Sequence, residues 1–120
     1  MRLGKSIRLS RLLDIYGELL TERQRTVLSE YVNEDLSLYE IGEIYGISRQ
    51  GVRDTVLKAE ANLEEYDSKL GLLEKTDVIE AALASITQTS EHLPKPQRDA
   101  VWAECCLIAA QFNLEKSTED

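Results

Sequence analysis

Side chains that can recognise nucleic-acid bases stand close together near the middle of the chain, at Arg49, Gln50 and Arg53. An arginine can donate two hydrogen bonds to guanine, and a glutamine can form two hydrogen bonds with adenine. Ser48, just before them, is a typical N-cap residue, and the positive end of a helix that begins there favours phosphate. With Lys58 further along the segment, these residues are the candidate nucleic-acid contacts.

A helix beginning after Ser48 would separate these side chains from its apolar residues. Val52, Val56 and Ala59 fall on one stripe at helical spacing. Arg49, Gln50 and Arg53 therefore project from a different face, which is suited to a major groove. Leu57 also points outward, where it can touch a thymine methyl group or a protein partner, and the sequence leaves both uses open.

A second, shorter helix is expected immediately before this one. Ser37 and Glu40 form a capping box that opens a helix at Leu38, and we expect Ile41 and Ile44 to point into a core.

The link between the two helices has the residues that a tight turn needs. Gly46 can take the left-handed conformation that ends a helix, Ile47 then enters the core, and Ser48 caps the next helix. Gly42 supplies a small residue where two steeply crossing helices approach. The spacing predicts a helix-turn-helix pair, and nucleic-acid recognition is the first hypothesis.

Two further helices precede the pair. Apolar residues at helical spacing predict the first over residues 7–20, and Thr21 with Gln24 forms a capping box that opens the next. Three helices are the minimum that can bury the apolar sides of such a pair. The expected fold is all-α: a trihelical helix-turn-helix core with an extended recognition helix and a C-terminal helical extension.

The recognition helix has no obvious stop after Lys58, since Gly71 is the first glycine that follows. We expect one helix of about 27 residues and about 40 Å. Apolar residues alternate at three and four residues along it, at Val56, Ala59, Leu63, Tyr66, Leu70 and Leu73. This seam can pack against a second copy of the chain, giving a homodimer through the stem, or against the chain's own C-terminal helices.

The C-terminal part is also expected to be helical. Thr76 or Asp77 can cap one helix, and Pro96 suits the first turn of a last helix with a broad apolar face. Cys105 and Cys106 are neighbours that cannot form an ordinary disulfide, so we expect buried thiols. We divide the chain into a helix-turn-helix core with a basic N-terminal arm, residues 1–60, and a stem with C-terminal helices for packing or dimerisation, residues 61–120.

Charge and composition limit the function classes. The 120 residues carry a net charge of -8, which is unusual for a protein that only holds nucleic acid non-specifically. Four basic residues precede the first acid, at Arg2, Lys5, Arg8 and Arg11. This arm can lie along phosphates or on an acidic protein surface, or it can be a solvated helix face.

Catalysis has little support. No histidine, serine or cysteine constellation offers an activated nucleophile, and the sequence has no glycine-rich phosphate loop and no metal-ligand pattern. We expect neither an enzyme nor a cofactor or metal site. Charged residues interrupt the apolar positions of the N-terminal segment, so no secretory signal or membrane span is expected, and the protein should be cytoplasmic.

The stretch from Leu20 to Lys75 resembles the YlxM family of small bacterial helix-turn-helix proteins, and more distantly the fourth conserved region of sigma factors. Its most specific parts are LTERQ, DLSLYEIGE, ISRQGVRD and LEEYDSKLGLLEK. The resemblance implies a cytoplasmic, non-enzymatic regulatory protein of the signal recognition particle pathway, because the family's genes lie beside those of particle components. Residues 76–120 lie outside the matching stretch.

Sigma factors use the corresponding second helix on promoter DNA, which by similarity implies contacts from Ser48, Arg49, Gln50 and Arg53. This chain departs from the sigma pattern after Lys58, where four acidic residues that would repel a DNA backbone follow: Glu60, Glu64, Glu65 and Asp67. Two functions remain. One is a DNA-binding regulator; the other is a protein or RNA adaptor of the targeting machinery that uses the fold as a scaffold.

Overall fold

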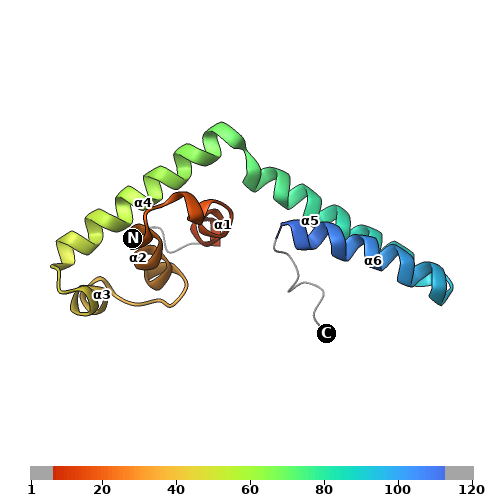
Figure 1. Cartoon of the computed structure of the whole chain (residues 1–120), viewed down its shortest axis with the longest axis horizontal. Helices are drawn as coiled ribbons and strands as arrows, with labels where there is room; N and C mark the ends of the chain where they lie inside the picture. The colour runs from red at the N-terminus through yellow and green to blue at the C-terminus, as the bar shows by residue number, and fades with distance from the viewer. Residues whose placement is uncertain (1–6, 113–120) are drawn as a thin grey trace. The chain divides into compact units, whose positions relative to one another are not determined.

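The computed structural model describes residues 7–112, and this part of the chain is built from helices without a strand (Figure 1). The elements are α1 (Ile7–Tyr16), the 3-10 helix η1 (Gly17–Leu19), α2 (Glu22–Val32), α3 (Leu38–Tyr45), α4 (Arg49–Leu70), α5 (Leu72–Thr89), the 3-10 helix η2 (Ser90–His92) and α6 (Lys95–Gln111). The all-α prediction is confirmed. The chain divides into two compact units, one ending at Leu73 and the other beginning at Glu74.

Both predicted capping boxes are present. The Gln24 N–H donates to Oγ1 of Thr21 at 3.1 Å, and the Thr21 N–H donates to Oε1 of Gln24 at 3.2 Å. Ser37 and Glu40 make the equivalent pair at 3.0 and 2.9 Å. These reciprocal bonds satisfy N–H groups that a helix start otherwise leaves unpaired, which is why α2 and α3 begin where the sequence predicts.

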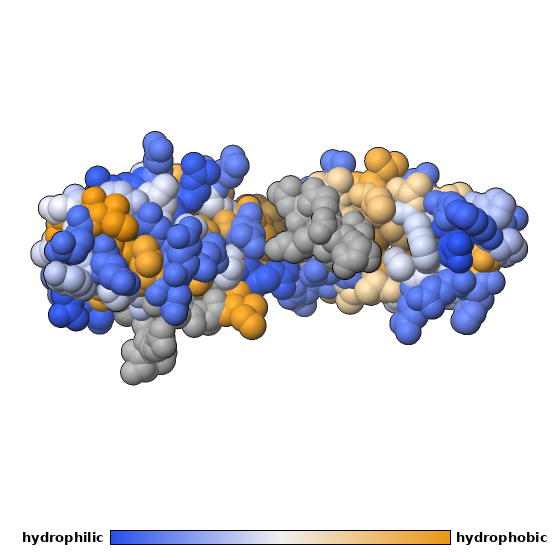
Figure 2. All heavy atoms as spheres, turned by 90° about the horizontal axis from the view of Figure 1, so that it is seen from below, coloured by the Kyte–Doolittle hydropathy of each residue, from blue (hydrophilic) through white to orange (hydrophobic). Residues whose placement is uncertain are grey.

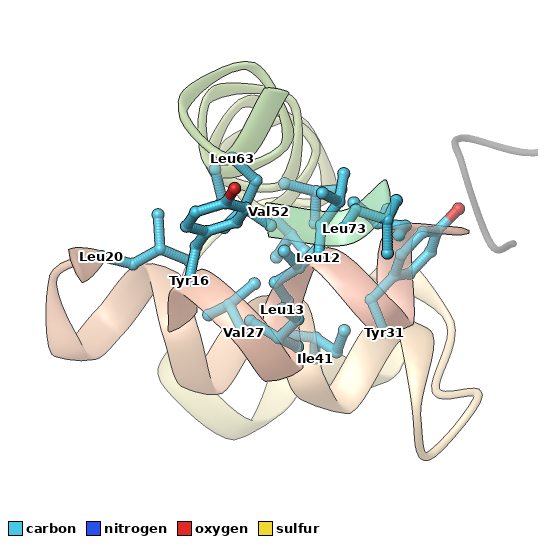
Figure 3. Packing of buried hydrophobic residues seen from close by; sticks show 14 residues of the cluster. Leu12, Leu13, Tyr16, Leu20, Val27, Tyr31, Ile41, Val52, Leu63 and Leu73 are labelled. Atoms are coloured by element: carbon cyan, nitrogen blue, oxygen red, sulfur yellow. The ribbon is translucent and has the colours of Figure 1, made fainter. Parts of the chain in front are cut away.

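The first unit is organised around one hydrophobic core. Side chains from α1, α2, α3 and α4 converge in it (Figure 3). Its members with 0% exposure are Leu12, Val27, Leu28, Ile41, Val52, Val56, Ala59 and Leu63. Packing on this core stabilises α3, which at eight residues is too short to persist alone.

Ile44 does not belong to this core, and its predicted inward position is wrong. Its side chain is 57% exposed. The buried stripe of α3 runs instead through Ile41 and Gly42, with the partly buried Leu38 and Tyr45 at its ends. These four residues occupy the face of α3 that points towards the core, and Ile44 lies outside that face.

The recognition helix is shorter than predicted, because α4 ends at Leu70 after 22 residues. Gly71 closes it in the left-handed conformation (φ 64°, ψ 29°), with its N–H bonded to the Asp67 carbonyl. A glycine adopts that conformation at little cost, so the helix stops here without a proline. The predicted helix of about 27 residues is therefore wrong.

The apolar seam of α4 has its partner within the first unit. Val56, Ala59 and Leu63 are buried in the same cluster as residues of α1 and α2. Neither predicted partner, a second copy or the C-terminal helices, occupies these positions. Further along, Tyr66 is only partly buried against the core and Leu70 is 52% exposed.

The next helix begins earlier than predicted, because α5 starts at Leu72 and not after Thr76 or Asp77. Its first N–H groups are capped by one side chain from α1 and one from the last turn of α4. The Leu72 N–H donates to the Tyr16 hydroxyl at 3.0 Å, and the Leu73 N–H donates to Oδ1 of Asp67 at 3.1 Å. The Tyr16 cap comes from 56 residues away and has no local sequence signature.

The second unit contains α5 from Glu74 onward and α6, which are joined by η2. Pro96 lies in the first turn of α6, as predicted. The Trp102 indole N–H donates to the Ser90 hydroxyl at 2.7 Å, which ties α6 to η2. Cys105 is buried but Cys106 is exposed, so only one thiol matches the prediction. Consecutive residues point about 100° apart on a helix, so burial of one thiol does not require burial of the next.

Apolar side chains remain on the surface of the second unit. Val78 is 62% exposed and Leu107 is 60% exposed, and Figure 2 shows apolar residues among the polar ones over α5 and α6. Within residues 7–112, no helix has the length and hydropathy needed to cross a membrane.

Candidate nucleic-acid interface

The turn between α3 and α4 has the predicted geometry. Gly46 is left-handed (φ 68°, ψ 33°) and its N–H bonds to the Gly42 carbonyl. The Ile47 N–H donates to the same carbonyl at 3.0 Å. A Cβ added to Gly42 would lie 2.6 Å from the Ile47 carbonyl oxygen, closer than side chains tolerate. The close approach of α3 to the turn therefore requires glycine at position 42.

Ser48 begins the recognition helix. Its extended backbone (φ -76°, ψ 161°) and its Oγ, which accepts the Gly51 N–H at 3.0 Å, make it the N-cap predicted from sequence. The N–H groups of Arg49 and Gln50 remain at the open end of α4, where helix geometry provides no carbonyl for them. The start of α4 thus presents donors as well as the positive end of the helix dipole.

The predicted contact residues all lie on the solvent side of α4. Ser48, Arg49, Gln50, Arg53 and Lys58 are exposed. On the opposite side, Val52, Val56 and Ala59 have 0% exposure. The structure therefore brings the five candidates to one accessible surface, although contact with nucleic acid stays a prediction.

This surface has an internal order, which follows from about 100° of rotation per residue. Gln50 and the 40%-exposed Leu57 lie along its centre. Arg49 and Arg53 flank that line on one side, and Asp54 and Lys58 flank it on the other. We call this set the α4 reading face: Arg49, Gln50, Arg53, Asp54, Leu57 and Lys58.

Asp54 is a member of the reading face that we did not single out from the sequence. The Gln50 side-chain amide donates from Nε2 to Oδ1 of Asp54 at 2.9 Å. Both residues are exposed. The signal was available, since glutamine and aspartate four residues apart on a helix face pair readily.

Most of the acidic residues after Lys58 contact basic or polar groups of the same chain. Arg8 makes a two-pronged contact with Glu64, with Nη2–Oε1 at 2.7 Å and Nε–Oε2 at 3.0 Å. The hydrogen bond from Arg8, more than its Coulomb attraction, lowers the pKa of the Glu64 carboxyl. Lys69 lies 3.3 Å from Glu65. The expected repulsion of a DNA backbone is reduced accordingly.

The same contacts change the interpretation of the basic N-terminal arm. Arg8 is paired with Glu64 and also lies 3.8 Å from Asp67, so its charge serves the packing of α1 on α4. Arg11 is partly buried and has interactions of its own. Arg2 and Lys5 lie outside the described residues.

Another cation lies near the turn. The Arg23 guanidinium stacks over the Tyr45 ring, 4.8 Å from its centroid, and the Tyr45 hydroxyl donates to Oε2 of Glu30 at 3.2 Å. This stacking fixes an exposed positive charge of α2 beside α3. Among residues 7–112, no group of three or more histidine, cysteine, aspartate or glutamate side chains is arranged to hold a metal ion.

Comparison with known proteins gives a family match over most of the chain. The model of the UPF0122 family, described as "Putative helix-turn-helix protein, YlxM / p13 like", matches residues 3–100. The match reaches into α6, so the expectation that residues 76–120 lie outside the resemblance is corrected for residues 76–100.

Individual relatives agree with this match. A UPF0122 protein of Shouchella clausii is 48% identical over 84 residues, which cover 70% of this chain and 77% of the relative. A UPF0122 protein of Clostridium kluyveri is 55% identical over 74 residues, covering 62% and 67%. One from Bacillus thuringiensis is 40% identical over 104 residues, covering 84% and 94%.

Proposed function

The chain belongs to the UPF0122 family of YlxM/p13-like helix-turn-helix proteins, and on that premise we propose that it is a non-enzymatic regulator that binds duplex DNA through α4. The observation that carries the proposal is the two-sided construction of this helix. One side is fully buried in the core, and the other presents the α4 reading face without a covering element in its own unit.

The roles of the candidate contacts follow from their positions. Arg49, Gln50 and Arg53 lie in the first two turns, where a helix entering the major groove approaches base edges. The Ser48 oxygen is occupied by the Gly51 N–H, which leaves its O–H to donate to a phosphate. Lys58 lies further along α4 and is assigned to the DNA backbone.

The net negative charge of the chain is compatible with DNA binding, because part of the acidic charge is paired with cations of the same chain while the cations of the α4 reading face have no ion pair within residues 7–112. The overall charge is -8. Glu64 and Glu65 each have a cation of the same chain within 4 Å, whereas no ion pair is found for Arg49, Arg53 or Lys58 among the described residues. The N-terminal half of α4 therefore keeps a local positive field in a negatively charged protein.

The setting is part of the proposal. Action in the cytoplasm, within the signal recognition particle pathway, rests on the resemblance to the YlxM family alone. Packing or dimerisation through residues 61–120 also stays a prediction, and the burial of the α4 seam leaves α5 and α6 as the surface for it.

A protein or RNA adaptor of the targeting machinery is the second candidate. The exposed apolar side chains of the second unit favour it, because Val78 and Leu107 are each at least 60% exposed. Scattered apolar residues are normal on a surface, but two helices carrying several of them suit a protein partner.

Fluorescence anisotropy separates the two candidates. We would titrate the full chain into mixed-sequence duplex DNA and into signal recognition particle RNA at two salt concentrations. The test variant is Arg49→Ala/Arg53→Ala. The matched control is Arg25→Ala/Lys69→Ala, which removes the same charge from exposed positions outside the reading face.

Salt-sensitive DNA binding that is lost in the test variant and kept in the control would support the regulator. Equal loss in both variants would indicate attraction by overall charge. Binding to neither nucleic acid would make the adaptor the better candidate, and capture of a targeting component would then have to survive Arg49→Ala/Arg53→Ala.

A further inference from the structure

The pairing of Gln50 with Asp54 restricts what the α4 reading face can recognise. A carboxylate accepts hydrogen bonds and donates none, so the amide nitrogen of Gln50 must face Asp54, as the 2.9 Å contact from Nε2 to Oδ1 shows. Turning the amide over would place Oε1 against the carboxylate. The pairing therefore favours this orientation of the Gln50 amide before any DNA arrives.

In this orientation the amide leaves one defined pair of groups for a base. The second N–H of Nε2 remains a donor, and Oε1 remains an acceptor. Adenine presents the matching pair in the major groove, with N7 accepting and the N6 amino group donating. Asp54 thus holds Gln50 in the orientation that matches adenine before the two meet, which strengthens the preference that glutamine already has for this base.

Asp54 also offers a group of its own. Its second oxygen, Oδ2, is an acceptor on the same exposed face. The Asp54 backbone lies about 6 Å further along the helix axis than that of Gln50, at four residues of 1.5 Å, and the hydrogen bond holds the ends of the two side chains together. The amino groups of cytosine and adenine can donate to it. Guanine presents two acceptors there, N7 and O6, and would meet the carboxylate with like polarity.

Resting on the proposed function, we propose that Gln50 and Asp54 act as one reading unit, which selects adenine at Gln50 and an amino-bearing base, cytosine or adenine, at the neighbouring position. Guanine is rejected at that second position. In this arrangement, attraction to DNA of any sequence comes from Arg49, Arg53 and Lys58. Discrimination between bases comes from Asp54, the acidic residue on the same face. An aspartate on a face that approaches phosphates otherwise only weakens binding.

The test is a selection from randomised duplex DNA, followed by anisotropy on the enriched sites, with the full chain. The wild type should enrich adenine next to an adenine or cytosine. Asp54→Asn keeps the size of the side chain but adds a donor, so guanine should be accepted at the second position and discrimination against it should fall roughly tenfold. Gln50→Ala should lose the adenine preference while guanine stays excluded at the second position.

Glu65→Gln is the matched control, because it removes the same charge from an exposed position of α4 outside the reading face. It should leave the selected sequence unchanged. If Asp54→Asn raises affinity for all duplexes by the same factor, Asp54 only repels phosphate and the reading unit is refuted. If the wild type binds duplex DNA without any base preference, the reading unit is refuted while DNA binding stands. A wild type that binds no duplex overturns the proposed function and this inference together.

Discussion

The Tyr16 hydroxyl donates a hydrogen bond to Oδ1 of Asp67 at 2.7 Å across 51 residues of sequence, and it accepts the Leu72 N–H at 3.0 Å. One buried phenol thus joins α1 to the end of α4 and to the first N–H group of α5. Burial, reinforced by the hydrogen bond to Asp67, raises the pKa of the Tyr16 phenol, which keeps its proton available for donation.

Tyr16→Phe should lower the free energy of unfolding by about 1 to 2 kcal/mol, because it removes the hydrogen bond to Asp67 and leaves the Leu72 N–H without its acceptor. Urea denaturation followed by circular dichroism measures this change. Tyr39→Phe is the control, since the Tyr39 side chain is 60% exposed and its hydroxyl can bond to water. Equal effects of the two substitutions would mean that the Tyr16 network contributes nothing beyond a surface hydroxyl.

The Arg8–Glu64 pair should make part of the stability depend on pH. Arg8 lowers the pKa of Glu64 in the folded state below its ordinary value of 4.5, so the pair stabilises the fold above that value. The contribution is lost as the pH falls through the lowered pKa. Because both side chains are about half exposed, we expect about 0.5 to 1 kcal/mol at neutral pH.

Denaturation of the wild type and of Glu64→Gln between pH 7 and about pH 3 tests this dependence. The two proteins should differ at neutral pH and converge at the acidic end. Glu65→Gln is the reference, because it removes the exposed contact between Glu65 and Lys69 on the same helix. A difference that persists unchanged at low pH would show that Glu64 acts through packing and not through its charge.

Local features of the fold were predictable because their physical cause lies within a few residues. Ser37 with Glu40 and Ser48 with Gly51 are hydrogen-bonded across three positions, so their caps follow from the sequence. Gly46 is the same kind of case, because the turn needs a left-handed residue directly after α3.

The remaining features depend on partners that lie far away in the sequence. Nothing in the local sequence distinguishes Glu64 from the acidic residues near it, because its partner Arg8 lies on α1, 56 residues away. The start of α5 depends on Tyr16 in the same way, and local capping residues such as Thr76 were misleading. The apolar period of α4 indicated a buried seam correctly, but a periodicity does not identify what covers it.

Within the candidate interface, the exposed side of α4 was predictable from the stripe of Val52, Val56 and Ala59. The pairing of Gln50 with Asp54 was not recognised, because we considered each side chain by its own affinity for bases. A side-chain contact on the helix surface changes what the glutamine has left to offer, and the structure shows that contact at 2.9 Å.

Gly42→Ala should destabilise the protein by about 1 to 3 kcal/mol, since the new methyl group would press on a backbone carbonyl that has no room to move. The added Cβ would lie 2.6 Å from the Ile47 oxygen. Gly51→Ala is a sharp control, because its nearest contact would be 3.4 Å and the site is helical. There the change should stabilise α4 by about 0.5 to 1 kcal/mol through helix propensity. The melting temperatures of the two variants should therefore move in opposite directions, and an unchanged or raised melting temperature in Gly42→Ala would contradict the close approach at Gly42.

Lys58→Ala and Gln50→Ala should weaken DNA binding in different ways if the assigned roles are correct. Loss of a phosphate contact reduces affinity by a similar factor for every sequence, and lowers the slope of log K against log salt by roughly 1. Loss of a base contact costs about 1 to 3 kcal/mol on the preferred site, and little on other duplexes. Anisotropy titrations of one selected and one scrambled duplex over a salt series measure both quantities. A salt slope that Gln50→Ala lowers and Lys58→Ala leaves unchanged would reverse the two assignments, and would place the DNA backbone at the start of α4.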